Sequence, residues 1–206
     1  MTKCPNCWQK IETCFCTWVK PVSPPLKLLI LQHPQESRNP LSTSRLLALS
    51  VRQSIHRVGL SWRSLSSAVG EKVESRNWCV LFLGTKRDSK RSDSQKTIQI
   101  RSRLGETIEK DTLQGLVVLD GNWKQSKTLW WRNPWLIRLK RVVLSPDTLS
   151  HYGNTRMEPR PECLSTLESV ALCLSEFAGG ESVRGTLMQN QETFLNRAAR
   201  ELQALI

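Results

Sequence analysis

The chain has 206 residues, of which 39% are hydrophobic and 23% charged, and this composition excludes a disordered protein. Thirty lysines and arginines face eighteen aspartates and glutamates, giving a net charge of +12 that favours a polyanion such as nucleic acid as partner. The alternative is a basic surface that serves solubility alone. No apolar run approaches the roughly 20 residues of a membrane helix. The N-terminus lacks the apolar core of a signal peptide, so we expect a cytoplasmic protein.

Four cysteines crowd the N-terminus in the pattern Cys4-x2-Cys7-x6-Cys14-x-Cys16. Four thiolates complete the tetrahedron that zinc prefers, and a CxxC turn supplies two of them together. A redox CxxC and simply buried thiols are the alternatives, but redox motifs normally open a helix within a βαβ unit, and this cluster precedes every expected strand. The spacing therefore predicts a structural zinc site. The other three cysteines lie in apolar contexts and are expected to be core thiols: Cys79, Cys163 and Cys173.

Apolar strands alternate with helices along the rest of the chain. We expect strands over 26–31, 78–83, 116–120 and 142–144. Helices are expected over 44–58, over 122–132, from Ser165 to Gly179-Gly180, and from Leu195 to the end. Residues 84–112 are predicted to form an exposed loop or irregular insertion, and 145–163 a long loop. The pattern predicts an α/β domain with a mostly parallel sheet and flanking helices over 26–206. A Pro-rich break at 21–25 separates it from a small zinc knuckle at 1–20.

Asp120 ends the third expected strand and is followed by Gly121, Asn122 and Trp123. Ligands of open α/β sheets bind beyond the carboxyl ends of strands, which makes Asp120 a candidate site residue. Asn122 can cap the next helix, with Gln125 three residues later. The alternative is a purely structural turn whose aspartate caps that helix.

Residues 121–146 contain no acidic residue and combine cations with tryptophans, a mixture that suits phosphates and unpaired bases. Lys124, Lys127 and Trp131 share one face of the expected helix. The alternative is that the tryptophans are core residues, and we expect two of the four to be so. The cations are Lys124, Lys127, Arg132, Arg138, Lys140 and Arg141, and the aromatic residues are Trp123, Trp130, Trp131 and Trp135.

Together these residues resemble the DTW-domain proteins, the tRNA-uridine aminocarboxypropyltransferases. The resemblance runs through six segments in order. They are 4–8 with 14–16 (CPNCW and CFC), 31–36 (LQHPQE), 42–46 (STSRL), 119–123 (LDGNW), 133–136 (NPWL), and 150–152 with 164–169 (SHY and LSTLES). Two departures stand out. Asn122 replaces the threonine of the Asp-x-Thr-Trp signature, and Arg156 comes one residue later than the family arginine.

The resemblance implies a knotted SPOUT-like fold that binds S-adenosylmethionine. Such a protein moves the 3-amino-3-carboxypropyl group to N3 of a tRNA uridine. Asp120 would act as general base, or would orient the uracil or the cofactor's amino group. The cofactor would be held by Leu83, Gly84, Gly121, Asn122, Trp123, Leu144, Tyr152, Leu164, Ser165 and Thr166, with the helix start at Ser165 receiving its carboxylate.

RNA contacts are expected from His33, Thr43, Arg45, Lys124, Lys127, Trp131 and Arg156, with Glu36 near the entrance. Glu168 has the spacing of a capping residue, Ser165-x-x-Glu168, and is expected to cap its helix rather than to catalyse. Two other functions stay open, an RNA methyltransferase and a non-catalytic zinc-containing RNA-binding protein.

Overall fold

The computed structural model describes residues 3–9, 11, 14–39, 41–82, 98–102, 105–144 and 164–203. Within these ranges six strands form one sheet in the order β2-β1-β5-β3-β6-β4. The first five strands in that order pair in parallel, and β4 pairs antiparallel with β6. The strands are β1 (Lys27–Gln32), β2 (Ser54–Val58), β3 (Trp78–Phe82), β4 (Ile98–Arg101), β5 (Gly115–Asp120) and β6 (Lys140–Leu144).

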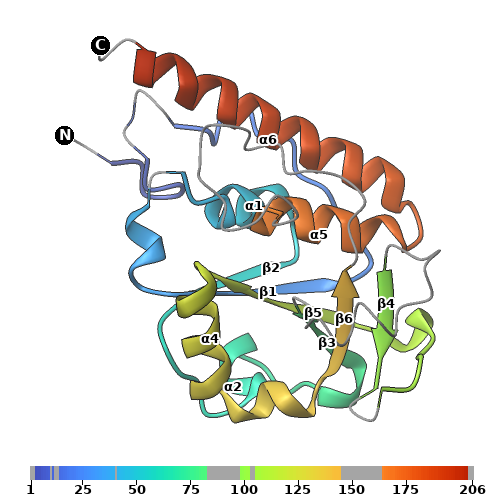
Figure 1. The fold of residues 1–206 in the computed structure, drawn as a ribbon. Coiled ribbons are helices and arrows are strands. Elements are labelled where there is room, and N and C mark those ends of the chain that lie inside the picture. The colour runs from blue at the N-terminus through green and yellow to red at the C-terminus, as the bar shows by residue number, and fades with distance from the viewer. Residues whose placement is uncertain are drawn as a thin grey trace.

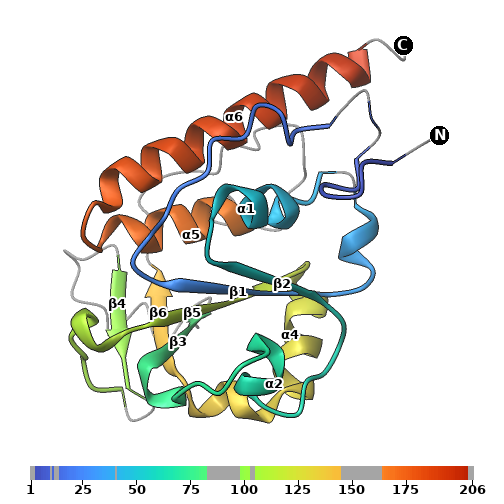
Figure 2. The ribbon, with the colours of Figure 1, turned by 180° about the vertical axis from the view of Figure 1, so that it is seen from behind.

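Helices cover both faces of the sheet, so the molecule has three layers (Figures 1 and 2). One face carries α1 (Ser44–Ser50), α5 (Thr166–Ser175) and α6 (Gly180–Gln203). The other carries α2 (Leu65–Val69), α4 (Trp123–Arg132) and the 3-10 helix η5 (Pro134–Arg138). Shorter 3-10 turns are η2 (Glu36–Arg38), η3 (Ser75–Asn77) and η4 (Lys110–Thr112).

Side chains of each central strand alternate between two hydrophobic cores. In β1, Leu28 and Ile30 join the core beneath α1, α5 and α6, whereas Leu29 and Leu31 join the core above α2 and η5. Because both faces are covered, the interior positions of β1, β3 and β5 are apolar, as those of parallel strands usually are. The predicted α/β class with a mostly parallel sheet and flanking helices is confirmed.

The expected helix over 44–58 is wrong in its second half. Helix α1 ends at Ser50, and Ser54–Val58 form β2, which pairs in parallel with β1 from Leu28↔Ser54 to Gln32↔Val58. Ile55 and Val58 fit a helical period over this short stretch, but both are β-branched residues that suit a strand. Pairing with β1 decides between the two readings.

The segment expected to be an exposed insertion also contains structure. Ile98–Arg101 form β4, in which Ile98 and Ile100 are buried on either side of the half-buried Gln99. This alternation over four residues has the period of a strand. Residues 83–97 and the loop expected at 145–163 lie outside the described residues. The knotted arrangement stays a prediction.

The C-terminal helices differ from expectation in their junction. Helix α5 ends at Ser175, and Gly180 begins α6, which starts fifteen residues before the expected Leu195. Its early turns bury Val183 and Leu187, and then the polar Asn190 and Gln191 occupy buried positions. Two buried amides interrupt the apolar stripe, so periodicity alone locates only the end of this helix. No described helix is both long and apolar enough to cross a membrane.

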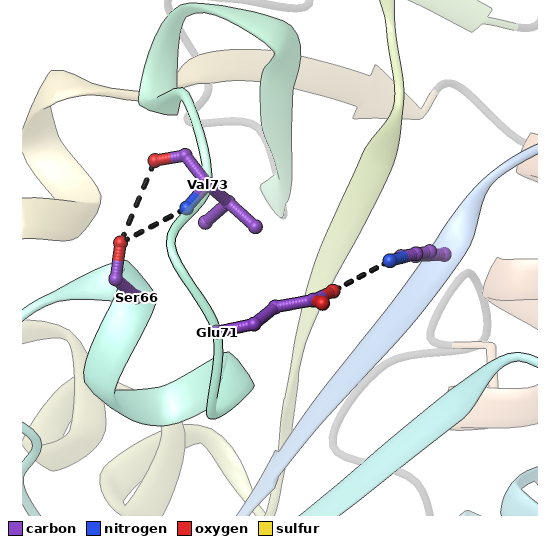
Figure 3. Close-up of polar contacts among 4 residues, drawn as sticks. Ser66, Glu71 and Val73 are labelled. Carbon is purple, nitrogen blue, oxygen red and sulfur yellow. Dashed lines mark hydrogen bonds and ion pairs between the residues drawn. The ribbon is translucent and has the colours of Figure 1, made fainter.

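A tied-down loop follows α2 and supports the start of β1 (Figure 3). The Ser66 hydroxyl accepts a hydrogen bond from the backbone N–H of Val73 at 3.2 Å, and the Glu71 carboxylate lies 2.5 Å from Nζ of Lys27. Both partners of this ion pair are exposed, so it contributes less than about 1 kcal/mol. The loop therefore fixes geometry near the amino end of β1, at the opposite end of the strand from Gln32.

Candidate active site and metal centre

The four N-terminal cysteines converge as their spacing predicts. Their Sγ atoms all lie within 4.8 Å of one another, with Cys4 to Cys16 at 3.8 Å and Cys7 to Cys14 at 3.6 Å. A tetrahedral zinc ion with Zn–S bonds of about 2.3 Å separates its sulfurs by about 3.8 Å. The arrangement therefore fits a metal ion and is consistent with zinc.

Backbone groups already favour a thiolate at one of these positions. Hydrogen bonds from the backbone of Cys7 and Asn6 lower the pKa of Cys4 to about 6, whereas burial raises the pKa of Cys16. Thiolates, not thiols, ligate metals. A metal cation among the four sulfurs would stabilise the thiolate form of Cys16 that burial otherwise disfavours.

The four-cysteine knuckle, whose described residues are 3–9, 11 and 14–20, packs against helices of the α/β domain. Phe15 is buried and meets Phe194 of α6 edge-on, with ring centroids 5.9 Å apart. The Asn190 side chain joins the knuckle to α6 by accepting from the Lys20 backbone N–H (3.1 Å) and donating to the Lys20 carbonyl (2.9 Å). The proposed domain boundary after residue 20 stays a prediction. Cys4, Cys7 and Phe15 pack in the same hydrophobic core as residues of the sheet.

Arg45 connects the knuckle to α1. Its guanidinium lies over the Trp8 ring, 5.0 Å from the centroid, and donates to the Cys7 carbonyl at 3.5 Å. This is a cation–π contact combined with a hydrogen bond inside the protein. Arg45 was expected to contact RNA, and its described contacts are with the knuckle.

Asp120 lies at the carboxyl end of β5 and is only 4% exposed. Thr166, the first residue of α5, donates from Oγ1 to Asp120 Oδ1 at 2.6 Å. Gln32, paired with Asp120 across β1 and β5, donates from Nε2 to Oδ2 at 2.9 Å, and Ser42 Oγ lies 3.4 Å from the same oxygen. Each carboxylate oxygen can accept two hydrogen bonds. Among the described residues, Oδ1 therefore keeps one acceptor position beyond its bond from Thr166.

The Gln32 amide extends this network to β2. Its Nε2 also lies 2.9 Å from Ser42 Oγ and 2.7 Å from Ser44 Oγ, and its Oε1 lies 3.1 Å from Nε2 of His56. Burial and the neighbouring Arg45 charge lower the pKa of His56 to about 4. His56 is therefore neutral at pH 7.

The start of α5 forms the other wall of the site. Ser165 and Glu168 form the expected capping box, in which Ser165 Oγ accepts from the Glu168 N–H and the Glu168 carboxylate accepts from the Ser165 N–H. The capping role expected for Glu168 is confirmed. The N–H groups of Thr166 and Leu167 have no acceptor within the helix, and the positive end of the helix dipole suits an anion there.

The turn from β5 into α4 is tightly built. Gly121 has φ +156°, and a Cβ there would lie 2.7 Å from Cβ of Gln125 and 3.4 Å from Cβ of His33, so a glycine is required. Asn122 and Gln125 form a second capping box, so the cap survives the Thr-to-Asn departure. His33 is held beside this turn by its backbone N–H, which donates to the Asp120 carbonyl at 3.0 Å.

Helix α4 presents a basic, aromatic face, formed by the exposed side chains of Lys124, Lys127 and Trp131. Trp131 is 66% exposed and Trp123 is 60% exposed. Trp130 and Trp135 instead pack against the core that lies between the sheet and the α2 and η5 helices. Two of the four tryptophans were expected to be core residues, and the two that contact the core, Trp130 and Trp135, are half-buried.

The other expected site residues are placed as follows. Thr43 is 2% exposed at the start of α1, and Leu144 and Leu164 are half-buried at the end of β6 and just before α5. Glu36 is buried in η2 and accepts from Asn39 Nδ2 at 2.8 Å. Leu83, Gly84, Tyr152, Arg156 and Cys163 lie outside the described residues. The expected core thiols Cys79 and Cys173 are buried, and their burial raises both pKa values.

Sequence reasoning missed Gln32, Ser42, Ser44 and His56 as site residues. Gln32 and Ser42 fell within matched segments without receiving a role, and His56 lay in a stretch expected to be helical. The only signal was a polar residue, Gln32, ending an otherwise apolar strand. Such a residue needs a buried partner.

The fold and site define an α/β protein with a four-cysteine knuckle and a buried carboxylate at the carboxyl edge of its sheet. A family model described as "DTW domain" matches residues 1–199, so the chain belongs to the DTW-domain family. The resemblance seen in the sequence is thereby confirmed.

Three relatives carry the name tRNA-uridine aminocarboxypropyltransferase 2. The chain is 28% identical to the one from Drosophila melanogaster over 206 aligned positions. This match covers 93% of this chain and 72% of that protein. It is 28% identical to the Mus musculus protein over 196 residues and 26% identical to the Macaca fascicularis protein over 192. In both cases the match covers 91% of this chain but only 60% of the mammalian protein. No solved structure matches the chain.

Proposed function

We propose that this protein is a tRNA-uridine aminocarboxypropyltransferase. It would transfer the 3-amino-3-carboxypropyl group of S-adenosylmethionine to N3 of a tRNA uridine and release methylthioadenosine. The observation that carries the proposal is the DTW-domain match over residues 1–199, together with relatives named for this activity. The geometry around Asp120 supports it.

The carboxyl edge of the sheet suits a donor that carries a carboxylate. Ser165 caps α5 and Thr166 begins it beside Asp120, and the N–H groups of the first turn that have no partner within the helix favour an anionic group. Gly121, Asn122 and Trp123 would contribute from β5 and α4, with Leu144 and Leu164 nearby in the proposed pocket. When bound, S-adenosylmethionine supplies an electrophilic carbon and a good leaving group, so positioning is the protein's main task.

Asp120 is proposed to act at the proton of uridine N3. The nitrogen must lose this proton as its bond to carbon forms, and a carboxylate oxygen within hydrogen-bond reach can accept it. Oδ1 is the oxygen for this role, because Thr166 occupies one of its acceptor positions while Gln32 and Ser42 converge on Oδ2. Asp120 is the group from this chain that would touch the reacting atom.

The tRNA is proposed to lie across the face formed by Lys124, Lys127 and Trp131. This face follows directly from the turn after Asp120, so a strand bound there leads toward the proposed reaction centre. The lysines meet phosphates and the tryptophan stacks on an unpaired base. The proposed zinc site in the knuckle would have a structural role and no catalytic one, since four thiolates leave no open coordination position on the metal.

Two measurements test the function. Purified protein incubated with tRNA and S-adenosylmethionine should release methylthioadenosine, and nucleoside mass spectrometry of tRNA from cells lacking the protein should show the loss of an aminocarboxypropyl-uridine. Release of S-adenosylhomocysteine would make the protein a methyltransferase. Binding of tRNA without any turnover would make it a non-catalytic RNA-binding protein.

Replacement of Asp120 tests the residue assignment. Asp120→Asn keeps the shape and removes the base, so methylthioadenosine release should fall by at least about 100-fold, the lower range for general base catalysis. Affinity for tRNA should stay within a few fold, measured by filter binding. Unchanged turnover would remove Asp120 from the mechanism.

A further inference from the structure

The carboxylate of Asp120 is held by an amide whose direction is fixed by chemistry. Gln32 Nε2 lies 2.9 Å from Asp120 Oδ2. An ionised carboxylate only accepts hydrogen bonds, so the Gln32 atom facing it must be the N–H donor and not the carbonyl oxygen. A rotated amide would place one acceptor against another. The acceptor character of the Asp120 carboxylate therefore fixes which end of the Gln32 amide faces it.

His56 fixes the same amide from the opposite side. With Nε2 of Gln32 turned to Asp120, Oε1 faces Nε2 of His56 at 3.1 Å. A carbonyl oxygen accepts, so His56 must carry its proton on Nε2 and donate. The imidazole tautomer and the amide direction thus determine each other, just as the hydrogen-bond partner of a metal-ligating histidine fixes its tautomer.

The strand register explains why these three residues meet. Gln32 is directly opposite Asp120 in the β1–β5 pair, and His56 is opposite Ile30, two residues before Gln32, in the β1–β2 pair. Residues at these positions point to one face of the sheet, the face covered by α1, α5 and α6. Gln32 is 0% exposed, so bulk water does not compete for its hydrogen bonds.

Gln32 has two N–H groups and three acceptors near them, namely Ser42, Ser44 and Asp120. The bond to the carboxylate is charge-assisted and is the stronger one. The two serines, 3.0 Å apart, can satisfy each other by rotating their hydroxyls. The serines therefore tolerate rearrangement, whereas the bond to Asp120 depends on the amide direction alone.

We propose that Gln32 and His56 are positioning residues, which set the rotation of the Asp120 carboxylate so that Oδ1 is directed to the substrate. This inference rests on the proposed function. Arg45 on α1 is the charged group whose electrostatic effect lowers the pKa of His56, and among the described residues Gln32 connects His56 to Asp120 on β5. Burial keeps the His56 ring neutral, and a neutral ring adds no uncompensated charge to the network.

Two substitutions at one position separate positioning from packing. His56→Phe keeps an aromatic ring and removes the donor, whereas His56→Gln supplies a side-chain N–H at a similar reach. Val58→Ala, on the exposed end of the same strand, is the matched control. Thermal melts identify any variant that fails to fold.

His56→Phe should lower kcat for methylthioadenosine release by roughly 10- to 100-fold, the penalty of a misplaced reacting group. KM for tRNA should change less than about threefold, because His56 touches no part of the proposed RNA face. His56→Gln should recover most of kcat, and Val58→Ala should match the wild type. Equal losses in His56→Phe and His56→Gln, or a kcat for His56→Phe within about twofold of wild type, would overturn the proposal.

A second readout does not depend on turnover. Nitrogen-15 NMR of the imidazole should show the Nε2–H tautomer in the wild type, and Gln32→Met should release that preference. An Nδ1–H tautomer would overturn the positioning network even in an active enzyme. Absence of methylthioadenosine release with the Nε2–H tautomer present would instead count against the proposed function and leave the network standing.

Discussion

The half-buried His56 makes the protein's stability depend on pH. Burial and Arg45 lower its pKa from 6.5 to about 4, so the folded chain resists a proton that the unfolded chain accepts. The stability that this confers is fully present above about pH 6.5 and is lost as the pH falls toward 4. At about 1.4 kcal/mol per pKa unit, the loss reaches about 2 kcal/mol at pH 5 and about 3 kcal/mol at pH 4.

Urea unfolding at about pH 7.5, 6 and 5, with zinc supplied throughout, measures this term when wild type and His56→Phe are compared. The phenylalanine variant is expected to be less stable at pH 7.5, because Gln32 loses a buried partner. The gap should close by about 2 kcal/mol by pH 5, since only the wild type carries the histidine penalty. Val58→Ala should run parallel to the wild type. A gap that stays constant within about 0.5 kcal/mol would refute a half-buried His56 with a lowered pKa.

Three further predictions concern the knuckle and α4. Replacing Lys124 and Lys127 together by glutamine should weaken tRNA binding and reduce the slope of log affinity against log salt by about 1 to 2, whereas Arg76→Gln, on an exposed turn elsewhere, should not. An unaltered slope would mean that neither lysine meets phosphate. Cys14→Ser should abolish stoichiometric zinc in elemental analysis and lower the melting temperature, and full zinc retention would exclude the four-sulfur site. Asn122→Ala should cost about 1 kcal/mol in urea unfolding through loss of the cap, and Asn122→Thr less than about 0.5 kcal/mol. Equal stability of all three chains would show that the cap contributes nothing.

Features encoded within a few residues were predictable from the sequence. Both capping boxes, at Asn122 and at Ser165, appeared where their four-residue patterns predict them. The four cysteines met as their spacing implied, and the apolar runs that became β1, β3, β5 and β6 were recognised as strands. In each case the residues that form the feature lie within a short stretch of the sequence, so the pattern could be recognised there.

Features that depend on distant pairing were not predictable in this way. β2 is a strand because β1 offers it hydrogen bonds, although its side chains also fit a helical period. The length of α6 was hidden by Asn190 and Gln191, which are buried because they bond to Lys20, Ser50 and Ser165. Gln32 and Asp120 meet across 88 positions of the sequence, so no local pattern shows that they form one site.

Helix α1 places two functions on neighbouring residues. Ser44 reaches the Gln32 amide beside Asp120, and Arg45, the next residue, clasps the knuckle through Trp8 and the Cys7 carbonyl. A single peptide bond thus separates the residue that contacts the knuckle from the residue that contacts the proposed active site. A chain shortened to begin at residue 21 would lose the partners of Arg45 and leave its charge half-buried opposite His56. Attempts to reduce this protein to a minimal enzyme should therefore keep the first twenty residues, even though none of them is proposed to touch the substrate's reacting atoms.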